Sequence, residues 1–179
     1  QENGSLSNVK PAGEGADSYV SDPANPVPYT RAITSGRSRE YMVEDQRFAG
    51  RRPDVMTYQT DILTEDVVLS GPIVADLFVS VTGTDADFIV KVIDVFPDDF
   101  PEHENKYMDV PMNGYQMMVR GEIFRGKYRN SFENPEAFVP GEVANVNYTL
   151  PHISHTFKQG HRVMIQVQSS WFPLADRNP

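Results

Sequence analysis

GHRVMIQVQSSWFP, residues 160–173, is the stretch of sequence that decides the fold class. Within it Val163, Ile165 and Val167 alternate with methionine and glutamine, and this period of two is typical of a β-strand with one buried face. An aromatic-proline corner follows the alternation. We therefore predict a strand over residues 162–169 whose three branched aliphatic side chains face the core.

Further strand patterns lie upstream, separated by clusters of Gly, Pro and Asp. The predicted strands are residues 55–59, 66–69, 73–82, 88–96 and 145–150. Ser70-Gly71-Pro72 is expected to end the second strand and Pro151 the last, whereas residues 114–124 fit either a strand or a short helical turn. Since no helical period is sustained, the sequence predicts an all-β fold: an antiparallel jelly-roll β-sandwich with long connecting loops and little helix.

The length and composition fit a single globular domain. The chain has 179 residues, of which 39% are hydrophobic and 23% are charged, and a chain of this size buries roughly 70% of its unfolded surface. We predict one β-sandwich domain over residues 1–179. Residues 1–52 are expected to form an extended N-terminal strand and a long loop, because their prolines disfavour helix, and residues 53–179 the main sandwich.

The charge of the chain argues against two classes of partner. The formal net charge is -9, which repels phosphate backbones and anionic lipids, and no apolar run approaches the ~20 residues that span a bilayer. We therefore expect neither nucleic acid nor a membrane as a partner. The absence of cysteine excludes disulfides, thiolate metal sites and a cysteine nucleophile, and it leaves the compartment open.

The histidines form no recognisable catalytic or metal-binding motif. A serine hydrolase commonly carries its nucleophile in G-x-S-x-G, and this motif does not occur in the chain. His152 and His155 have the i, i+3 spacing that suits a metal on a helix, but they follow Pro151 in a predicted strand-to-turn region. We therefore predict solvated loop histidines, and we expect no metal site and no cofactor.

Carboxylates cluster in residues 98–104, and hard cations such as calcium bind several carboxylates on one loop. This segment lacks the glycine turn and the spacing of a calcium loop, so we predict a solvated charged turn. Asp85 and Asp87 lie at a predicted strand start, where carboxylates usually accept hydrogen bonds from turn N–H groups. A structural role is therefore expected for both.

The aromatic residues of the second half allow two interpretations. They are Tyr107, Tyr115, Phe124, Tyr128, Phe132 and Phe138. Exposed aromatic side chains on jelly rolls sometimes line a sugar-binding groove, whereas packing in a core or an interface is their commoner role. The sequence leaves both interpretations open.

Five long phrases carry a resemblance to a known family. They are YVSDPANPVPY (residues 19–29), MVEDQRFAGRRPDVMTYQT (42–60), LTEDVVLSGPIVADLFVSVTGTDADFIVKVIDVFPDD (63–99), GYQMMVRGEIFRGKYRNSF (114–132) and FKQGHRVMIQVQSSWFPLADRNP (157–179). In this order they resemble the C-terminal domain of the X-Pro dipeptidyl-peptidase and cocaine esterase (CocE/NonD) group of α/β hydrolases. Within that group the resemblance is strongest to the α-amino-acid ester hydrolases, also called glutaryl-7-aminocephalosporanic acid acylases.

The resemblance implies a jelly-roll domain that follows an α/β-hydrolase domain and its helical cap in the complete enzyme. That family hydrolyses or transfers acyl groups of α-amino-acid esters and β-lactam amides with a serine, histidine and aspartate triad. The triad belongs to the upstream catalytic domain, so no residue here inherits a catalytic role, and the implied partner is that domain of the same polypeptide. The resemblance also implies that the chain is truncated at both ends relative to the parent enzyme, and that its location is periplasmic or secreted.

The loop over residues 28–45 is the predicted wall of the substrate cleft. In the family the jelly roll packs on the hydrolase domain and its loops help to wall the cleft, and long loops on rigid scaffolds tend to be functional. Tyr29, Arg31 and Tyr41 are the candidate residues. An interdomain clamp is the alternative role for this loop.

Two other function classes stay open. A carbohydrate-binding module shares the jelly-roll architecture and the exposed aromatic residues, and titration with oligosaccharides separates it from a hydrolase accessory domain. A structural or oligomerising domain, present as a homo-oligomer, would use an unpaired sheet edge, because such edges pair between chains.

Overall fold

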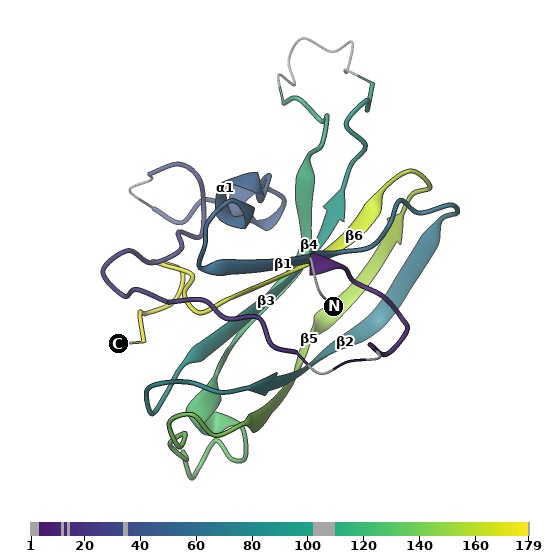
Figure 1. Cartoon of the computed structure of the whole chain (residues 1–179). Coiled ribbons are helices and arrows are strands. Elements are labelled where there is room, and N and C mark those ends of the chain that lie inside the picture. The colour runs from purple at the N-terminus through teal and green to yellow at the C-terminus, as the bar shows by residue number, and fades with distance from the viewer. Residues whose placement is uncertain (1–3, 12, 14, 34–35, 102–109, 179) are drawn as a thin grey trace.

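The computed structural model of the chain describes all residues except 1–3, 12, 14, 34–35, 102–109 and 179, and its described part is a β-sandwich. One sheet has the strand order β1-β6-β3-β4, and β2 pairs with β5 in the other (Figure 1). The strands are β1 (Val55–Gln59), β2 (Val67–Val79), β3 (Asp87–Val95), β4 (Gln116–Arg125), β5 (Ala144–Phe157) and β6 (Arg162–Gln168). All strand pairs are antiparallel, and the predicted fold class is confirmed.

The main hydrophobic core lies between the two sheets. Phe88, Val90 and Val92 of β3 are at most 5% exposed, and they pack with Val146 and Leu150 of β5. Because side chains two residues apart lie on the same face of a strand, the three β3 residues share the face toward β5. The core therefore follows from the alternation that the sequence shows.

The opposite face of the four-stranded sheet is covered as well. On β6, Met164, Gln166 and Gln168 are at most 5% exposed, whereas the aliphatic side chains within residues 163–167 are only partly buried against the inter-sheet core. The prediction of a single buried face on β6 was wrong. The reason is that described parts of the preceding segment pack on this second face: Tyr29 and Tyr41 contact the cluster around Ile89, and Gly50 at the end of α1, which lies beside β1 in Figure 1, is close to Gln166.

Strands β2 and β5 continue through the prolines that were expected to end them. Their register shifts between Gly71 and Ile73, and Pro72 and Pro151 fall within this irregularity. Proline cannot donate to a ladder, so it is tolerated where the ladder is interrupted, and Gly71 adopts the positive φ of 117° that the bulge requires. Residues 114–124, left open between strand and helix, lie mostly in β4.

In the described part of the chain there is little helix, as predicted. The helices with described bounds are η2 (Glu40–Met42), α1 (Arg47–Gly50) and η3 (Gly126–Tyr128). None of the helices in the described part of the chain is long and apolar enough to cross a membrane. The N-terminal segment is joined to the C-terminal segment by backbone hydrogen bonds from Tyr29 N to Phe172 O and from Phe172 N to Val27 O, each 2.9 Å long.

Candidate functional site

Residues 28–45, named here the cover loop, are anchored by two buried tyrosines. Tyr29 is 5% and Tyr41 7% exposed, and their ring centroids lie 5.4 Å apart. The Tyr41 ring packs edge-on against Trp171 at 5.9 Å, and the Tyr29 hydroxyl accepts a hydrogen bond from the Ser38 N–H at 3.1 Å. The two rings thus fix the loop on the sheet.

Arg31 is the candidate residue that the cover loop leaves exposed. Its backbone N–H donates to both carboxylate oxygens of Glu44, at 3.1 and 3.2 Å, which holds the backbone in place beneath an exposed side chain. Arg37 and Arg39 are exposed too, and Arg37 Nη2 donates to the Tyr41 hydroxyl at 2.8 Å. The cover loop therefore presents guanidinium groups, which bind carboxylates through paired hydrogen bonds.

A buried polar layer lies beneath this segment. Its members are Gln46, Lys91, Gln166 and Gln168, each at most 1% exposed. The Lys91 Nζ donates to Gln46 Oε1 at 2.9 Å and lies 5.1 Å from the centroid of the Trp171 ring. Burial lowers the pKa of Lys91 from 10.5 to about 7, and attraction to Glu44 opposes the shift. Sequence reasoning missed this layer, although a lysine inside an apolar strand was an available signal.

Asp94 of β3 joins two histidines from different elements. Its Oδ2 lies 2.8 Å from His155 Nε2 on β5, and its Oδ1 lies 2.7 Å from His161 Nδ1 just before β6. Of the two histidines predicted to be solvated loop residues, His152 is exposed, whereas the prediction was wrong for His155, because its ring bonds a carboxylate that is buried between the sheets. No group of ligands that could hold a metal ion is found in the described part of the chain.

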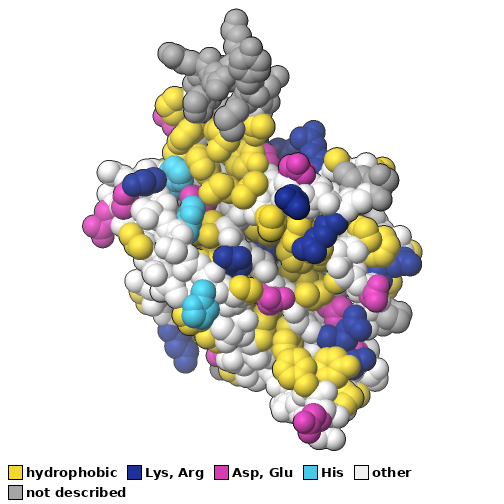
Figure 2. All heavy atoms as spheres, turned by 180° about the vertical axis from the view of Figure 1, so that it is seen from behind, with side chains coloured by type: hydrophobic (Ala, Val, Ile, Leu, Met, Phe, Trp, Pro, Cys, Tyr) yellow, Lys and Arg dark blue, Asp and Glu magenta, His cyan; other side chains and the backbone are white. Residues whose placement is uncertain are grey.

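A concavity of about 700 Å³ opens between the edge strands β4 and β5. The two strands contact each other where Arg120 Nη2 donates to His152 O at 2.8 Å. We name the site the aromatic concavity after four of its lining residues: Phe124, Tyr128, Phe132 and Tyr148. On the face seen in Figure 2, hydrophobic side chains gather toward the lower end, with basic side chains beside them.

The aromatic rings of the concavity form a continuous series. Phe124 stacks on Tyr148 with a centroid distance of 5.0 Å, and Phe132 contacts Phe124 edge-on at 6.0 Å and Tyr128 at 5.9 Å. Phe132 is 77% exposed. The structure thus brings together three of the aromatic residues that the sequence singled out, while Phe138 lies in the core and Tyr107 falls outside the described residues.

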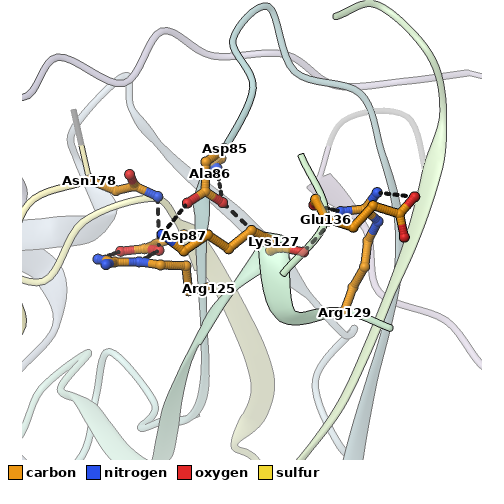
Figure 3. Close-up of polar contacts among 9 residues, drawn as sticks. Asp85, Ala86, Asp87, Arg125, Lys127, Arg129, Glu136 and Asn178 are labelled. Atoms are coloured by element: carbon orange, nitrogen blue, oxygen red, sulfur yellow. Dashed lines mark hydrogen bonds and ion pairs between the residues drawn. The ribbon is translucent and has the colours of Figure 1, made fainter. Parts of the chain in front are cut away.

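Ion pairs fix the wall of the aromatic concavity (Figure 3). Both carboxylate oxygens of the buried Asp87 accept from Arg125, at 2.8 and 3.0 Å, and this hydrogen bond raises the pKa of Arg125. Asn178 Nδ2 also donates to Asp87, at 3.2 Å. Asp85 Oδ1 accepts from the backbone N–H groups of Ala86 and, at 3.0 Å, of Lys127. Asp85 thus accepts turn N–H groups as expected, whereas Asp87 has a structural role of a different kind, since it is bonded by side chains.

The acidic segment 98–104 contributes to neither site among the described residues. Asp98 and Asp99 are exposed, in agreement with a solvated turn, whereas Glu102 and Glu104 lie outside the described residues. The candidate functional sites in the described part of the chain are therefore the arginine-bearing cover loop and the aromatic concavity.

Comparisons of this chain with known proteins agree on one family. Residues 4–179 match the family described as the X-Pro dipeptidyl-peptidase C-terminal non-catalytic domain. The cocaine esterase of Rhodococcus sp. (strain MB1 Bresler) is 37% identical over 175 residues, which make up 98% of this chain and 28% of the esterase.

Two solved structures are similar over the whole chain. The aminopeptidase from a marine sediment Thaumarchaeota archaeon has a TM-score of 0.90 and 47% identity, and the match covers 100% of this chain and 30% of the aminopeptidase. An α-amino acid ester hydrolase has a TM-score of 0.89 and 42% identity, over 99% of this chain and 29% of the hydrolase.

The chain spans less than a third of the length of these relatives, in which the domain sits with a larger catalytic part. The similarity runs through the cover loop, the β-sandwich and the aromatic concavity, because the matches cover essentially all of the chain. The predicted resemblance is confirmed. The chain belongs to the family of C-terminal non-catalytic domains of X-Pro dipeptidyl-peptidases and CocE-type hydrolases.

Proposed function

We propose that the chain is the accessory domain of a serine hydrolase that acts on α-amino-acid esters and related amides, including β-lactam amides. The observation that carries this proposal is the 42% identity with an α-amino acid ester hydrolase over 99% of the chain. In this proposal the serine, histidine and aspartate triad lies on another part of the full-length polypeptide. The bonding of His155 and His161 to Asp94 supports a structural role for these histidines.

The cover loop walls the substrate cleft in this proposal, and its three candidate residues have different tasks. Tyr29 and Tyr41 hold the loop on the sheet through their buried rings. Arg31 contacts the substrate, because its guanidinium is exposed while its backbone is fixed by Glu44. An arginine binds a carboxylate bidentately, so Arg31 favours acyl acceptors that carry a carboxylate.

Kinetics of the full-length enzyme with Arg31→Ala test this role. We expect KM for a carboxylate-bearing acyl acceptor to rise about 5- to 10-fold, with kcat preserved, because a charge-assisted hydrogen bond of roughly 1 kcal/mol is lost. An acceptor without a carboxylate should be unaffected. Arg51→Ala is the matched control, since Arg51 is an exposed arginine outside the cover loop. Unchanged kinetics of the Arg31 variant would contradict the proposal that the cover loop walls the substrate cleft.

A further inference from the structure

Lys91 lies at a position of β3 that would suit an aliphatic side chain. It shares one face of the strand with Ile89 and Ile93, and all three side chains are fully buried. A buried amine costs free energy that an aliphatic side chain does not, and burial lowers the pKa of Lys91 to about 7. The filling of the core alone therefore does not account for an amine at this position.

A chain of hydrogen bonds runs from this amine to Arg31. Lys91 Nζ donates to Gln46 Oε1 at 2.9 Å, and Gln46 Nε2 donates to Glu44 O at 2.9 Å. The Glu44 carboxylate accepts from the backbone N–H of Arg31, at 3.1 and 3.2 Å. The backbone of Glu44 is thus tied to β3, and its side chain in turn fixes the backbone of Arg31.

The same amine lies beside the aromatic anchor of the cover loop. Its Nζ is 5.1 Å from the centroid of the Trp171 ring, and Tyr41 packs edge-on against that ring at 5.9 Å. Tyr41 in turn contacts Tyr29 at 5.4 Å. Lys91 therefore adjoins both supports of the cover loop, and it belongs to β3, which lies between β6 and β4 in the sheet. An inner strand is a rigid base from which to position a loop.

We propose that Lys91 is a positioning residue for the substrate: through Gln46 it holds the cover loop where Arg31 meets the acyl acceptor. The inference rests on the proposed function, because it takes Arg31 as a residue that contacts the substrate. Lys91 is fully buried, so it acts on the substrate only through the loop. A directional hydrogen bond fixes the position of the loop more closely than apolar contacts do. An arginine that is fixed in advance loses less conformational freedom when it binds a carboxylate.

Kinetics of the full-length enzyme with Lys91→Met test the positioning role. Methionine fills a similar volume but donates no hydrogen bond, so the loop loses this support. We expect KM for a carboxylate-bearing acyl acceptor to rise about 2- to 4-fold with kcat preserved, less than in Arg31→Ala because the guanidinium is still present. An acceptor without a carboxylate should be unaffected. Lys158→Met is the matched control, because it removes an exposed lysine and should keep the wild-type KM.

A double variant, Arg31→Ala with Lys91→Met, separates positioning from a general weakening of the fold. If Lys91 acts through Arg31, its replacement has no further effect on KM once the guanidinium is gone. The same rise in KM with and without Arg31 would overturn the inference. A fall in kcat that is equal for both acceptors would overturn it too, because Lys91 would then affect the active site in another way.

Hydrogen exchange of the full-length protein gives a second readout, which needs no substrate. Overlapping peptides report the exchange of the Arg31 backbone N–H, which donates to the Glu44 carboxylate. We expect this N–H to exchange about 5-fold faster in Lys91→Met than in the wild type, while the N–H groups of β5 keep their wild-type rates. Unchanged exchange at Arg31 would overturn the inference whatever the kinetics show.

Two variants of Glu44 cover the case that Lys91→Met fails to fold, because Glu44 is only half-buried. Glu44→Ala removes both oxygens that accept from the Arg31 N–H, whereas Glu44→Gln keeps one of them. We expect the alanine variant to raise KM for the carboxylate-bearing acceptor about 2- to 4-fold and the glutamine variant to stay near the wild-type KM. A wild-type KM in Glu44→Ala would overturn the inference.

The kinetics of Arg31→Ala distinguish the two proposals. An altered KM in Arg31→Ala together with wild-type values in Lys91→Met and Glu44→Ala would reject the positioning inference alone. An unaltered KM in Arg31→Ala would reject the cleft-wall function, and the positioning inference with it.

Discussion

Lys91 and Gln46 form a buried hydrogen bond of 2.9 Å that connects the centre of the four-stranded sheet to the segment following the cover loop. Both side chains are at most 1% exposed. An uncharged amine suits this site, because burial opposes the charge of the ammonium group more strongly than the attraction to Glu44 favours it. The stability of the domain should therefore depend on pH in a range where few other groups titrate.

The first prediction is that the free energy of unfolding rises between pH 7 and pH 9.5. The pKa of Lys91 is about 7 in the folded chain, and it is about 10.4 in an unfolded chain. Between these values the unfolded state binds more protons, so stability increases with pH by up to about 1.4 kcal/mol per pH unit. Urea unfolding of residues 1–179, followed by the fluorescence of its single tryptophan, Trp171, measures the effect.

Two variants test whether Lys91 causes this pH dependence of stability. Lys91→Met should abolish the rise, because no buried amine remains to titrate. Lys158→Met changes the net charge equally but removes an exposed lysine that pairs with Asp66, and it should keep the rise. The same rise in both variants would contradict the assignment to Lys91.

A second prediction concerns Asp94, the carboxylate between His155 and His161. Asp94→Ala should lower the free energy of unfolding by about 2–3 kcal/mol, because the buried imidazole of His161 and the half-buried imidazole of His155 lose their hydrogen-bond partner. Asp98→Ala removes an exposed carboxylate from the end of the same hairpin and should change stability by less than about 0.5 kcal/mol. Urea midpoints of the two variants at pH 7 give the comparison, and equal midpoints would show that the histidine contacts contribute nothing.

The third prediction concerns the close packing at Gly126. A Cβ atom at this position would lie 2.5 Å from Phe138 Cε2 and 2.9 Å from Phe88 Cε2, both in the core. Gly126→Ala should therefore cost about 1–3 kcal/mol of stability through overpacking. Gly83→Ala is the control, because its nearest contact would be at 3.9 Å. A thermal midpoint of the Gly126 variant as high as that of the control would contradict the packing seen here.

The fourth prediction is that purified residues 1–179 do not hydrolyse an amino-acid ester. The family is described as non-catalytic, and His155 and His161 bond Asp94. The isolated chain should release a chromogenic leaving group from the ester no faster than buffer alone does. The full-length protein, tested in parallel, should release it faster. Turnover that co-purifies with the isolated chain would contradict the assignment of catalysis to the rest of the polypeptide.

The strands and the family were predictable from the sequence, whereas the candidate sites were only partly so. Alternation between residues 88 and 96 predicted the strand that the structure shows as β3, and long phrases in a fixed order predicted the family. The exposure of Arg31 and the burial of Tyr29 and Tyr41 did not follow from the sequence, since all three are side chains of one irregular loop. The pairing of Asp94 with His155 spans 61 residues, and no local pattern indicates it.

The sequence by itself determined where the chain is extended, because side-chain alternation and the punctuation by glycine and proline are local properties of a few neighbouring residues. Only the tertiary structure decided which faces are buried. Gln166 is fully buried because residues near Gln46, 120 positions earlier, lie across it. The aromatic concavity likewise depends on tertiary structure, because its lining residues come from β4 and β5, which belong to different sheets. Burial depends on what covers a face, and the covering segments are far away in the sequence.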